Sequence, residues 1–549
     1  MSTKEKFSNQ EVTKQSNFFS PTKTTIETAF YGNNVHPVNQ IKQAYKLAKN
    51  SKTTIVTDQV IKHTAQLGLP QDAKVLVNNH GRVVGRTAAA RHVIGEPGEN
   101  KTELNAVLRE AVYMGQNKEF YATEVLVGLD EEFMVKVHMM LPEGFEHNLL
   151  SYMLNFQPLD FEYRKRYNNS KHYDENDIYV YCDPTWENFA YPNGLVLFDP
   201  EHNVVAILGL RYFGELKKAT LTLAWSIAHR HGFTACHGGE KTFVLDNNEK
   251  KVFAFYGLSG SGKSTLTHAK HDNRFKRIDI LHDDAFIIER ESGRSIALEP
   301  AYFDKTSDYT VGDKEQEYFT TVMNVGVTLN ENGQKILVTE DIRNGNGRTI
   351  KSRYSSKNRI DSEKAPINSI FWIMKDDSLP PVVKLSDPIL AATFGLTLAT
   401  KRSTAENLVE KAKDELVIEP FANPFRVYPL AEDYHDFKAL FTKQEVDCYI
   451  VNTNSFNGVD ITKDVTLNLL ENIVKNEGDW RDFGELPQMS YLALPSYPVD
   501  LDNNYYRQKL QQRLHARLTW LETYQVQHQT TPLPGEVFTC LKNLIKKLA

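Results

Sequence analysis

The chain has 549 residues, enough for two or three domains with sizeable cores. Hydrophobic residues make up 41% and charged residues 24%, which is ordinary for a globular protein in water. The net charge of −6 gives no support for a nucleic-acid partner, which would leave a basic face or tract, and no apolar run reaches the roughly 18 residues of a membrane span.

The four cysteines lie far apart and include no C-x-x-C pair; they are Cys182, Cys236, Cys448 and Cys540. This spacing argues against a disulfide framework and against a cysteine zinc site. The N-terminal residues are polar and lack the apolar core of a signal peptide. We therefore expect a cytoplasmic enzyme with no membrane and no nucleic-acid partner.

Local patterns predict strands and helices in the first half of the chain. Residues 1–25 are rich in Ser, Thr, Lys and Gln, so we expect them to be poorly ordered. A strand over 72–77, a turn and a second strand over 82–84 come next. Apolar spacing then predicts a helix over 103–115. The elements expected after it are four short strands and a helix, at 120–127, 177–181, 195–198, 204–208 and 216–229.

The second half is predicted to begin with a β-hairpin from 242–245 to 251–256 and a strand at 278–281. The later elements expected are two strands and two helices, at 369–374, 447–451, 503–524 and 535–549. This mixture predicts an α/β fold of mixed α+β type. We expect an N-terminal, substrate-side domain over 26–230 and a C-terminal domain over 231–549.

The most informative pattern follows the predicted hairpin and opens a predicted helix. It matches the phosphate-loop pattern G-x-x-x-x-G-K-[ST] at every fixed position. The glycines let the backbone turn so that its N–H groups point at phosphate oxygens, Lys263 reaches the β- and γ-phosphates, and Ser264 holds the Mg²⁺ of the nucleotide. The residues predicted to bind ATP are Gly257, Leu258, Ser259, Gly260, Ser261, Gly262, Lys263, Ser264 and Thr265.

Two adjacent acids follow the strand predicted at 278–281, about twenty residues after the loop. A phosphate-loop enzyme places its metal-binding acid there, so we expect Asp284 to hold a divalent cation. The alternative is a solvated acidic turn. Other polar residues carry weaker signals when taken alone: His237 is flanked by glycine, Lys218 stands in a predicted helix start, and Arg86 is typical of a surface arginine.

Several segments, taken in order, resemble those of the ATP-dependent phosphoenolpyruvate carboxykinase family. The phosphate loop has the form of the ATP-dependent class, and residues 281–284 resemble the family's acidic kinase motif. Residues 212–218, 233–237 and 84–87 resemble its metal-lysine, metal-histidine and substrate-arginine segments. The resemblance implies a two-lobed carboxykinase-like fold with a P-loop nucleotide-binding C-terminal domain.

The resemblance also implies an activity and its ligands. The activity is the conversion of oxaloacetate and ATP to phosphoenolpyruvate, ADP and CO₂, a reaction of gluconeogenesis. Lys218, His237 and Asp284 would bind a catalytic Mn²⁺, and Lys218 would then have to be neutral. Lys263 would grip the phosphates, and Ser264 would hold the Mg²⁺ of MgATP. The partners implied are small molecules, with the chain a monomer or a small homo-oligomer.

The remaining residue roles implied by the resemblance concern the substrate and the nucleotide. Arg86 and Tyr212 would position the dicarboxylic substrate together with Lys218. Arg343 would bridge the substrate and the transferring phosphate, and Ser259 would lie beside the metal-bound waters. Arg402 would touch the nucleotide.

The chain departs from the family pattern at several places. After Arg86 it continues Thr-Ala-Ala-Ala-Arg instead of Ser-Pro-Lys-Asp-Lys, and Met323 stands where a glutamate is expected near the ribose. The text around Arg343 is also unlike the family, which leaves Arg348 and Arg353 as alternatives for the bridging arginine. Two other functions stay open on the sequence: a divergent P-loop kinase of another acid or of a protein, and a non-catalytic ATP-binding protein.

Overall fold

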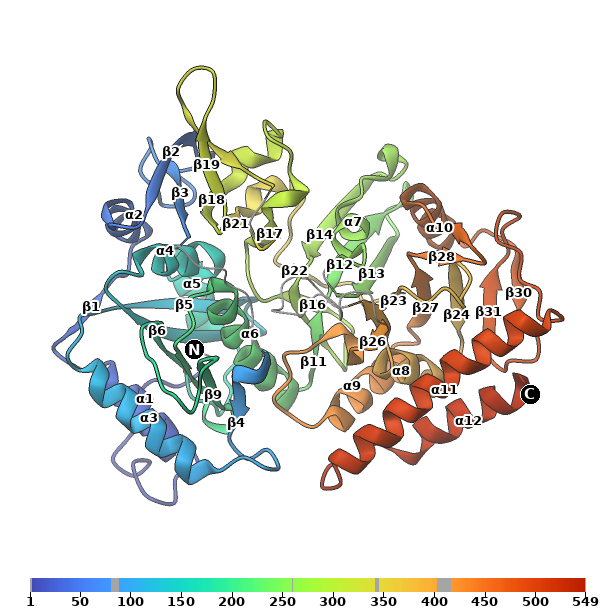
Figure 1. Ribbon diagram of the computed structural model, residues 1–549, viewed down its shortest axis with the longest axis horizontal. Coiled ribbons are helices and arrows are strands. Elements are labelled where there is room, and N and C mark those ends of the chain that lie inside the picture. The colour runs from blue at the N-terminus through green and yellow to red at the C-terminus, as the bar shows by residue number, and fades with distance from the viewer. Residues whose placement is uncertain (1, 80–87, 259, 341–344, 402–415, 549) are drawn as a thin grey trace. The chain divides into compact units, whose positions relative to one another are not determined.

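The computed structural model describes residues 2–79, 88–258, 260–340, 345–401 and 416–548. These residues form two compact units (Figure 1). Unit 1 consists of the described residues up to Ile227 together with Ala297–Lys357, and unit 2 consists of Ala228–Ile296 and the described residues from Asn358 onward.

Unit 1 is built on an eight-stranded mixed sheet in the order β1-β5-β6-β8-β10-β9-β4, with β7 paired to β5. Its inner strands β6, β8, β9 and β10 are buried along their whole length, as their near-continuous apolar sequences require. The strands are β1 (Val35–Pro37), β4 (Arg91–Val93), β5 (Phe120–Asp130), β6 (Phe133–Pro142), β7 (Gln157–Pro158), β8 (Ile178–Asp183), β9 (Leu195–Asp199) and β10 (Val204–Leu208).

A second sheet of unit 1 joins segments that are far apart in the sequence. Its order is β17-β21-β18-β3-β2, and the parallel pair β3–β18 aligns Leu76 with Thr321. The strands are β2 (Ile55–Val60), β3 (Lys74–Asn78), β17 (Tyr302–Lys305), β18 (Phe319–Met323) and β21 (Arg348–Lys351), with a separate hairpin of β19 (Gly326–Leu329) and β20 (Lys335–Val338).

The helices of unit 1 cover these sheets. Helix α4 contacts strands of both sheets, and all ten of its residues are buried. The helices are α1 (Pro21–Ala29), α2 (Ile41–Asn50), α3 (Lys101–Gly115), α4 (Glu146–Asn155), α5 (Phe161–Asn169) and α6 (Phe213–Arg230), the last of which runs across the division into unit 2.

Unit 2 contains an eight-stranded sheet, β14-β12-β13-β23-β27-β24-β31-β30, and a four-stranded sheet, β11-β15-β16-β22. The three central strands β13, β23 and β27 are parallel, so their carboxyl ends meet at one edge. The strands are β11 (Phe233–His237), β12 (Gly239–Val244), β13 (Lys250–Tyr256), β14 (Arg277–His282), β15 (Ala285–Glu289), β16 (Ser295–Ala297), β22 (Ser362–Glu363), β23 (Ser369–Met374), β24 (Val382–Leu385), β27 (Asp447–Asn452), β30 (Trp480–Asp482) and β31 (Met489–Leu492).

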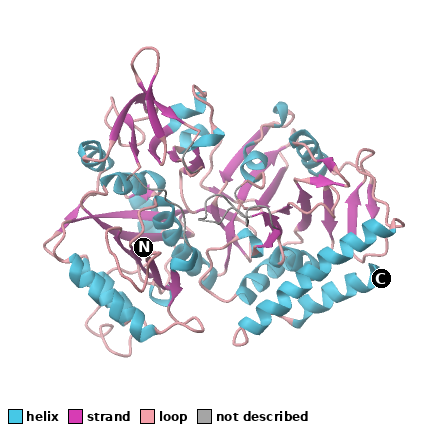
Figure 2. Ribbon diagram, in the orientation of Figure 1, coloured by secondary structure: helices cyan, strands magenta, loops and turns pink. Residues whose placement is uncertain are grey.

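The helices of unit 2 pack on these sheets and on one another. Helices α11 and α12 lie side by side, and α12 also contacts α8 (Figure 2). The helices are α7 (Lys263–His268), α8 (Pro388–Leu396), α9 (Leu430–Lys443), α10 (Lys463–Lys475), α11 (Asn504–Gln527) and α12 (Gly535–Leu548), and the small hairpins are β25 (Ala399–Lys401) with β26 (Leu416–Ile418) and β28 (Ser455–Phe456) with β29 (Val459–Asp460).

The predicted α/β class of mixed α+β type is confirmed. The expected hairpin is the antiparallel pair β12–β13, in which Val244 faces Lys250, and the expected helix at 103–115 is α3. The strand expected at 82–84 lies outside the described residues. The expected domain division stays a prediction. The two compact units differ from it because β17, β18 and β21 pair into the sheet that contains β3, which assigns residues 297–357 to unit 1.

The described N-terminal residues make buried contacts, although their composition favours weak order. Ser2 and Thr3 are buried, and the Thr3 hydroxyl donates a 2.6 Å hydrogen bond to Asp177. The Lys4 amide donates to the Glu175 carbonyl at 2.8 Å. Small polar side chains that form hydrogen bonds with buried groups do not add to the hydrophobic content of a segment. Composition alone therefore does not predict that these residues are buried.

Candidate functional site

The glycine-rich loop joins strand β13 to helix α7. Gly260 and Gly262 have φ angles of +83° and +101°, a region that side chains other than glycine rarely adopt. The Thr453 hydroxyl, just beyond β27, donates a 2.8 Å hydrogen bond to the Ser261 carbonyl. The loop is therefore tied to the edge where the parallel strands end. Ser259 lies outside the described residues.

Helix α7 begins at Lys263 and is held closely against strand β12. The Thr267 hydroxyl donates to the Lys263 carbonyl at 2.9 Å, and the buried Lys241 ammonium donates to the Leu266 carbonyl. Ser264 and Thr265 are exposed on the first turn of the helix. This packing fixes the position of the Lys263 backbone and so the point from which its side chain extends.

A methyl group at Gly239 is expected to disturb this packing. A Cβ there would lie 3.1 Å from the Thr267 Cβ and in collision with its hydroxyl, so the Thr267 side chain or the helix that carries it must shift. We expect Gly239→Ala to lower the free energy of unfolding by about 1–3 kcal/mol and to weaken ATP binding. Urea denaturation and calorimetric titration with ATP measure these two effects.

Gly535→Ala is the matched control, because a Cβ at Gly535 meets no atom within 4 Å. If Gly239→Ala binds ATP as tightly as the control does, the close approach of β12 and α7 does not position the loop.

The two acids between β14 and β15 have different partners. Backbone amides of Asp284 and Ala285 both donate to the His282 Nδ1 at 3.0 Å, which fixes the turn. Asp283 is buried and pairs with the His268 Nε2 at 3.2 Å. Burial on its own would raise the pKa of Asp283, but the hydrogen bond with His268 and the charges of His268 and Lys263 hold it below its usual range.

Asp284 brings together His237 and Lys263. Its Oδ1 lies 3.1 Å from the His237 Nε2 and 3.8 Å from the Lys263 Nζ. Two atoms bound at right angles to an octahedral ion, each about 2.1 Å away, would be about 3.0 Å apart. The spacing and the nitrogen and oxygen chemistry of the pair therefore fit a divalent metal.

The His237 ring is oriented by a contact on its far side. Its Nδ1 forms a hydrogen bond with the Ala422 carbonyl, and its ring lies edge-on to Phe425 with a centroid distance of 5.2 Å. The carbonyl accepts, so Nδ1 carries a proton, and Nε2 is the nitrogen that faces Asp284. A histidine held in this way is ready to act as a metal ligand.

The residues predicted from the metal-lysine segment lie in unit 1, on and just before α6. Lys217 is fully buried and its Nζ lies 2.7 Å from a Glu299 carboxylate oxygen, whereas Lys218 is half-buried with its Nζ 5.8 Å from the Trp225 ring centroid. Tyr212 is buried beside Phe303. The two adjacent lysines thus have different surroundings.

The predicted arginines Arg86, Arg343 and Arg402 lie outside the described residues. Of the two alternatives to Arg343, the Arg348 Nη1 donates to the Gly347 carbonyl at 2.9 Å, and the Arg353 Nη1 donates to the Tyr163 hydroxyl at 3.1 Å. The choice among the three stays open.

Sequence reasoning did not single out the two residues after the Gly-Gly pair, Glu240 and Lys241. Both are fully buried on β12. Besides capping α7, the Lys241 ammonium lies 2.8 Å from the His271 Nε2, and the His271 Nδ1 lies 3.0 Å from Glu471. Burial lowers the pKa of Lys241 well below its usual value, against the effect of the Glu471 carboxylate. The signal that could have identified these residues was the presence of two charged residues in a segment that otherwise has the pattern of a buried strand.

The buried carboxyl group of Glu240 is expected to make the stability of the folded chain depend on pH. Burial raises the pKa of Glu240 from 4.5 to about 8, against the Ser295 hydroxyl and with the aid of the Glu363 charge. Between these two pH values the folded chain holds a proton that the unfolded chain releases, so stability falls as the pH rises. At about 1.4 kcal/mol per pKa unit the effect amounts to several kcal/mol.

We expect Glu240→Gln to unfold at higher urea concentration than the wild type at pH 8, with the difference shrinking toward pH 5. Urea titrations at pH 5, 6.5 and 8 measure it, with the exposed Glu477→Gln as the control. An equal difference at all three pH values would show that Glu240 does not titrate in this range.

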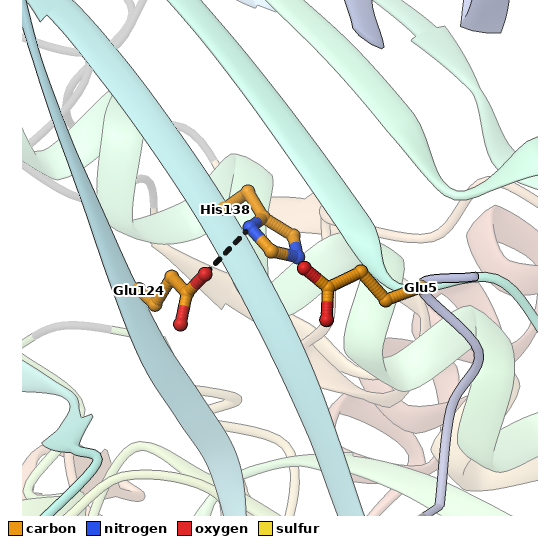
Figure 3. A group of neighbouring side chains, drawn as sticks. All are labelled: Glu5, Glu124 and His138. Atoms are coloured by element: carbon orange, nitrogen blue, oxygen red, sulfur yellow. Dashed lines mark ion pairs between the residues drawn. The ribbon is translucent and has the colours of Figure 1, made fainter. Parts of the chain in front are cut away.

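A second group of possible metal ligands lies in unit 1. Figure 3 shows the His138 ring between the carboxylates of Glu124 and Glu5. The Lys136 ammonium donates to Glu5 at 2.5 Å and lies 3.3 Å from Asp177, which also pairs with the His138 Nε2 at 2.9 Å. Because this ammonium already supplies a positive charge to the acids, the group is an ion-pair network that ties the N-terminal segment to β6 and to Asp177, just before β8.

No helix among the described residues is both long and apolar enough to cross a membrane.

A family model described as phosphoenolpyruvate carboxykinase, of the ATP-dependent group, matches residues 46–489. The chain belongs to this family. Membership confirms the predicted function and enzyme class, an ATP-dependent carboxy-lyase of the phosphoenolpyruvate carboxykinase type. It also confirms that ATP and a divalent metal are used.

Individual members of the phosphoenolpyruvate carboxykinase family show how far the likeness extends. The chain is 25% identical to the phosphoenolpyruvate carboxykinase (ATP) of Aeropyrum pernix over 373 residues, which cover 66% of this chain and 71% of that protein. It is 22% identical to the enzyme of the same name from Dictyostelium discoideum, over 35% of this chain and 36% of that one. The glycosomal enzyme of Trypanosoma brucei brucei is 23% identical, over 47% and 54% of the two chains.

Proposed function

We propose that the chain converts oxaloacetate and ATP to phosphoenolpyruvate, ADP and CO₂ at a site that includes the glycine-rich loop, His237 and Asp284. The metal-binding role of Lys218 stays a prediction. The observation that supports these residue roles most directly is the position of Asp284, within 4 Å of both His237 and Lys263. A metal ligand and a phosphate-binding lysine must be neighbours if one site is to stabilise both an enolate and a transferring phosphoryl group.

Each group has a part in the proposed reaction. Loss of CO₂ from oxaloacetate leaves an enolate, and a divalent metal held by His237 and Asp284 would supply positive charge beside its oxygen. The enolate oxygen then attacks the γ-phosphorus of ATP in line, and ADP leaves. Lys263 neutralises charge on the transferring phosphoryl group, and the loop amides hold the phosphates in place.

We assign the metal of His237 and Asp284 as Mn²⁺ and that of Ser264 as Mg²⁺. The donor set supports the first assignment, because an imidazole nitrogen beside a carboxylate is softer than the all-oxygen surroundings that Mg²⁺ prefers. Ser264, exposed at the start of α7, offers a hydroxyl oxygen suited to Mg²⁺. A monomer or small homo-oligomer and a cytoplasmic location stay predictions.

The reaction is tested with the purified chain, oxaloacetate, MgATP and micromolar Mn²⁺, by detecting phosphoenolpyruvate. We expect product from the wild type and none above background from Lys263→Ala. ATP binding without product from oxaloacetate would contradict the proposal. It would favour a kinase of another acid, consistent with the altered residues after Arg86.

A further inference from the structure

The segment 420–428 of unit 2 contacts the far side of the His237 ring, 185 residues away in the sequence. The contact is made by a main-chain carbonyl, that of Ala422. A carbonyl accepts only, so the ring donates its Nδ1–H to Ala422, and Nε2 is the nitrogen that faces Asp284 and is left for a cation. The position of one peptide group thus decides which nitrogen of His237 can bind a cation.

The backbone that presents this carbonyl has an unusual conformation. Phe421 and Ala422 both have a φ of +53°, and two consecutive residues other than glycine rarely adopt the left-handed region. The Phe421 ring stacks on Phe437 at 4.6 Å and 7°, and it packs against Trp372 at 5.9 Å. Packing from α9 and β23 therefore keeps a conformation that the chain would not adopt on its own.

One arginine closes the segment into a compact loop. The Arg426 Nη2 donates to the Pro420 carbonyl at 3.1 Å, and its Nε donates to Asp433, in the first turn of α9, at 2.7 Å. Asp433 also accepts from the Tyr428 hydroxyl at 2.8 Å. Arg426 thus fixes both ends of the turn that contains Ala422.

We propose that segment 420–428 positions His237 for metal binding. In this role the Ala422 carbonyl sets the tautomer, Phe425 limits rotation of the ring, and Arg426 holds the carbonyl in place. The proposal rests on the assignment of His237 as a metal ligand. Arg426 is a positioning residue, since it touches neither the metal nor the substrate in this arrangement.

The tautomer is read from ¹⁵N spectra of the metal-free, full-length Asp284→Ala chain labelled at histidine, because the Asp284 carboxylate is a second acceptor beside Nε2. We expect neutral His237 to carry its hydrogen on Nδ1 in Asp284→Ala and to shift toward the Nε2–H form when Arg426→Met is added. Nε2–H as the main form in Asp284→Ala would overturn the proposal.

Mn²⁺ affinity gives the second measurement. We expect Arg426→Met to weaken Mn²⁺ binding by about 10- to 100-fold, the range found when partners of metal-bound histidines are removed. ATP binding should stay within about twofold. In a His237→Ala background the same change should cause no further loss of Mn²⁺ affinity, because a positioning residue acts only through the ligand it positions.

Arg517→Met is the matched control. Arg517 is also a buried arginine of unit 2 that pairs with an aspartate, Asp376 at 3.0 Å, and donates to a backbone carbonyl, and its partners among the described residues include neither His237 nor a residue of segment 420–428. Its Mn²⁺ affinity should match the wild type. If Arg426→Met does not fold, Phe425→Leu keeps the apolar contact without the ring edge and should weaken Mn²⁺ binding several-fold.

The outcomes distinguish the positioning role of segment 420–428 from the assignment of His237 as a metal ligand. Wild-type Mn²⁺ affinity in every folded variant of Arg426 and Phe425, with weakened binding in His237→Ala, overturns the positioning role alone. Wild-type affinity in His237→Ala overturns the metal assignment, and the tautomer spectra then decide by themselves whether segment 420–428 orients the ring.

Discussion

Replacing Lys263 by alanine is expected to lower kcat for phosphoenolpyruvate formation by about 10²- to 10³-fold or more. Lys263 is nine-tenths buried at the start of α7, and its ammonium lies 3.8 Å from Asp284. Negative charge on the phosphoryl oxygens must be balanced while the group moves, and no water can replace a buried ammonium at this position. Removing an interaction that strengthens during phosphoryl transfer lowers kcat, so the KM for oxaloacetate should change little.

Steady-state kinetics with each substrate varied in turn measure the effect. Lys276→Ala is the control, because Lys276 is an exposed lysine of the same unit whose side chain bonds to Asn248. A loss confined to the KM for ATP, with kcat preserved, would limit Lys263 to holding the nucleotide in the ground state.

Replacing Asp284 by asparagine is expected to be nearly as damaging. Asparagine keeps the size of the side chain but removes the charge that His237 and Lys263 share. We expect Mn²⁺ affinity to fall by more than about 10²-fold, beyond the range for residues that only support a ligand. Turnover at subsaturating Mn²⁺ should fall with it and recover in part when Mn²⁺ is raised.

Mn²⁺ titration by paramagnetic resonance, with and without ATP, distinguishes loss of metal from loss of nucleotide. Asp272→Asn provides the control, since the Asp272 side chain is 89% exposed in the same unit. Unchanged Mn²⁺ affinity in Asp284→Asn would remove the aspartate from the ligand set and leave it as a partner of Lys263 only.

Sequence patterns predicted the candidate site residues that stand in recognisable motifs. The loop glycines and Lys263 follow β13, and the Asp283-Asp284 pair follows β14; both strands pair antiparallel with β12, so their carboxyl ends lie at the same edge. The Ala422 carbonyl and the turn at Arg426 could not be predicted in this way. A main-chain group carries no residue signature, and its contact with His237 joins segments that are 185 residues apart.

In the fold, too, elements within one segment could be predicted from the sequence, whereas pairing between distant segments could not. The β12–β13 hairpin and helix α3 follow from alternating and helical apolar spacing within single segments. The pairing of β3 with β18 does not, because nothing in residues 74–78 indicates which of many apolar strands will lie beside them. Parallel pairing at such separation is decided by how whole layers pack.

Synthesis on the ribosome gives the pairing of β3 with β18 a further consequence. The second sheet of unit 1 is incomplete until Lys351, the last residue of β21, has left the exit tunnel, by which time Ala228–Ile296 of unit 2 has already been made. A nascent chain that stops near residue 230 would carry β2 and β3 with an open edge, exposed to chaperones and to other chains. Separate expression of the first 230 residues should therefore give an aggregating fragment, while the intact chain can complete unit 1 once residues 297–357 have been made.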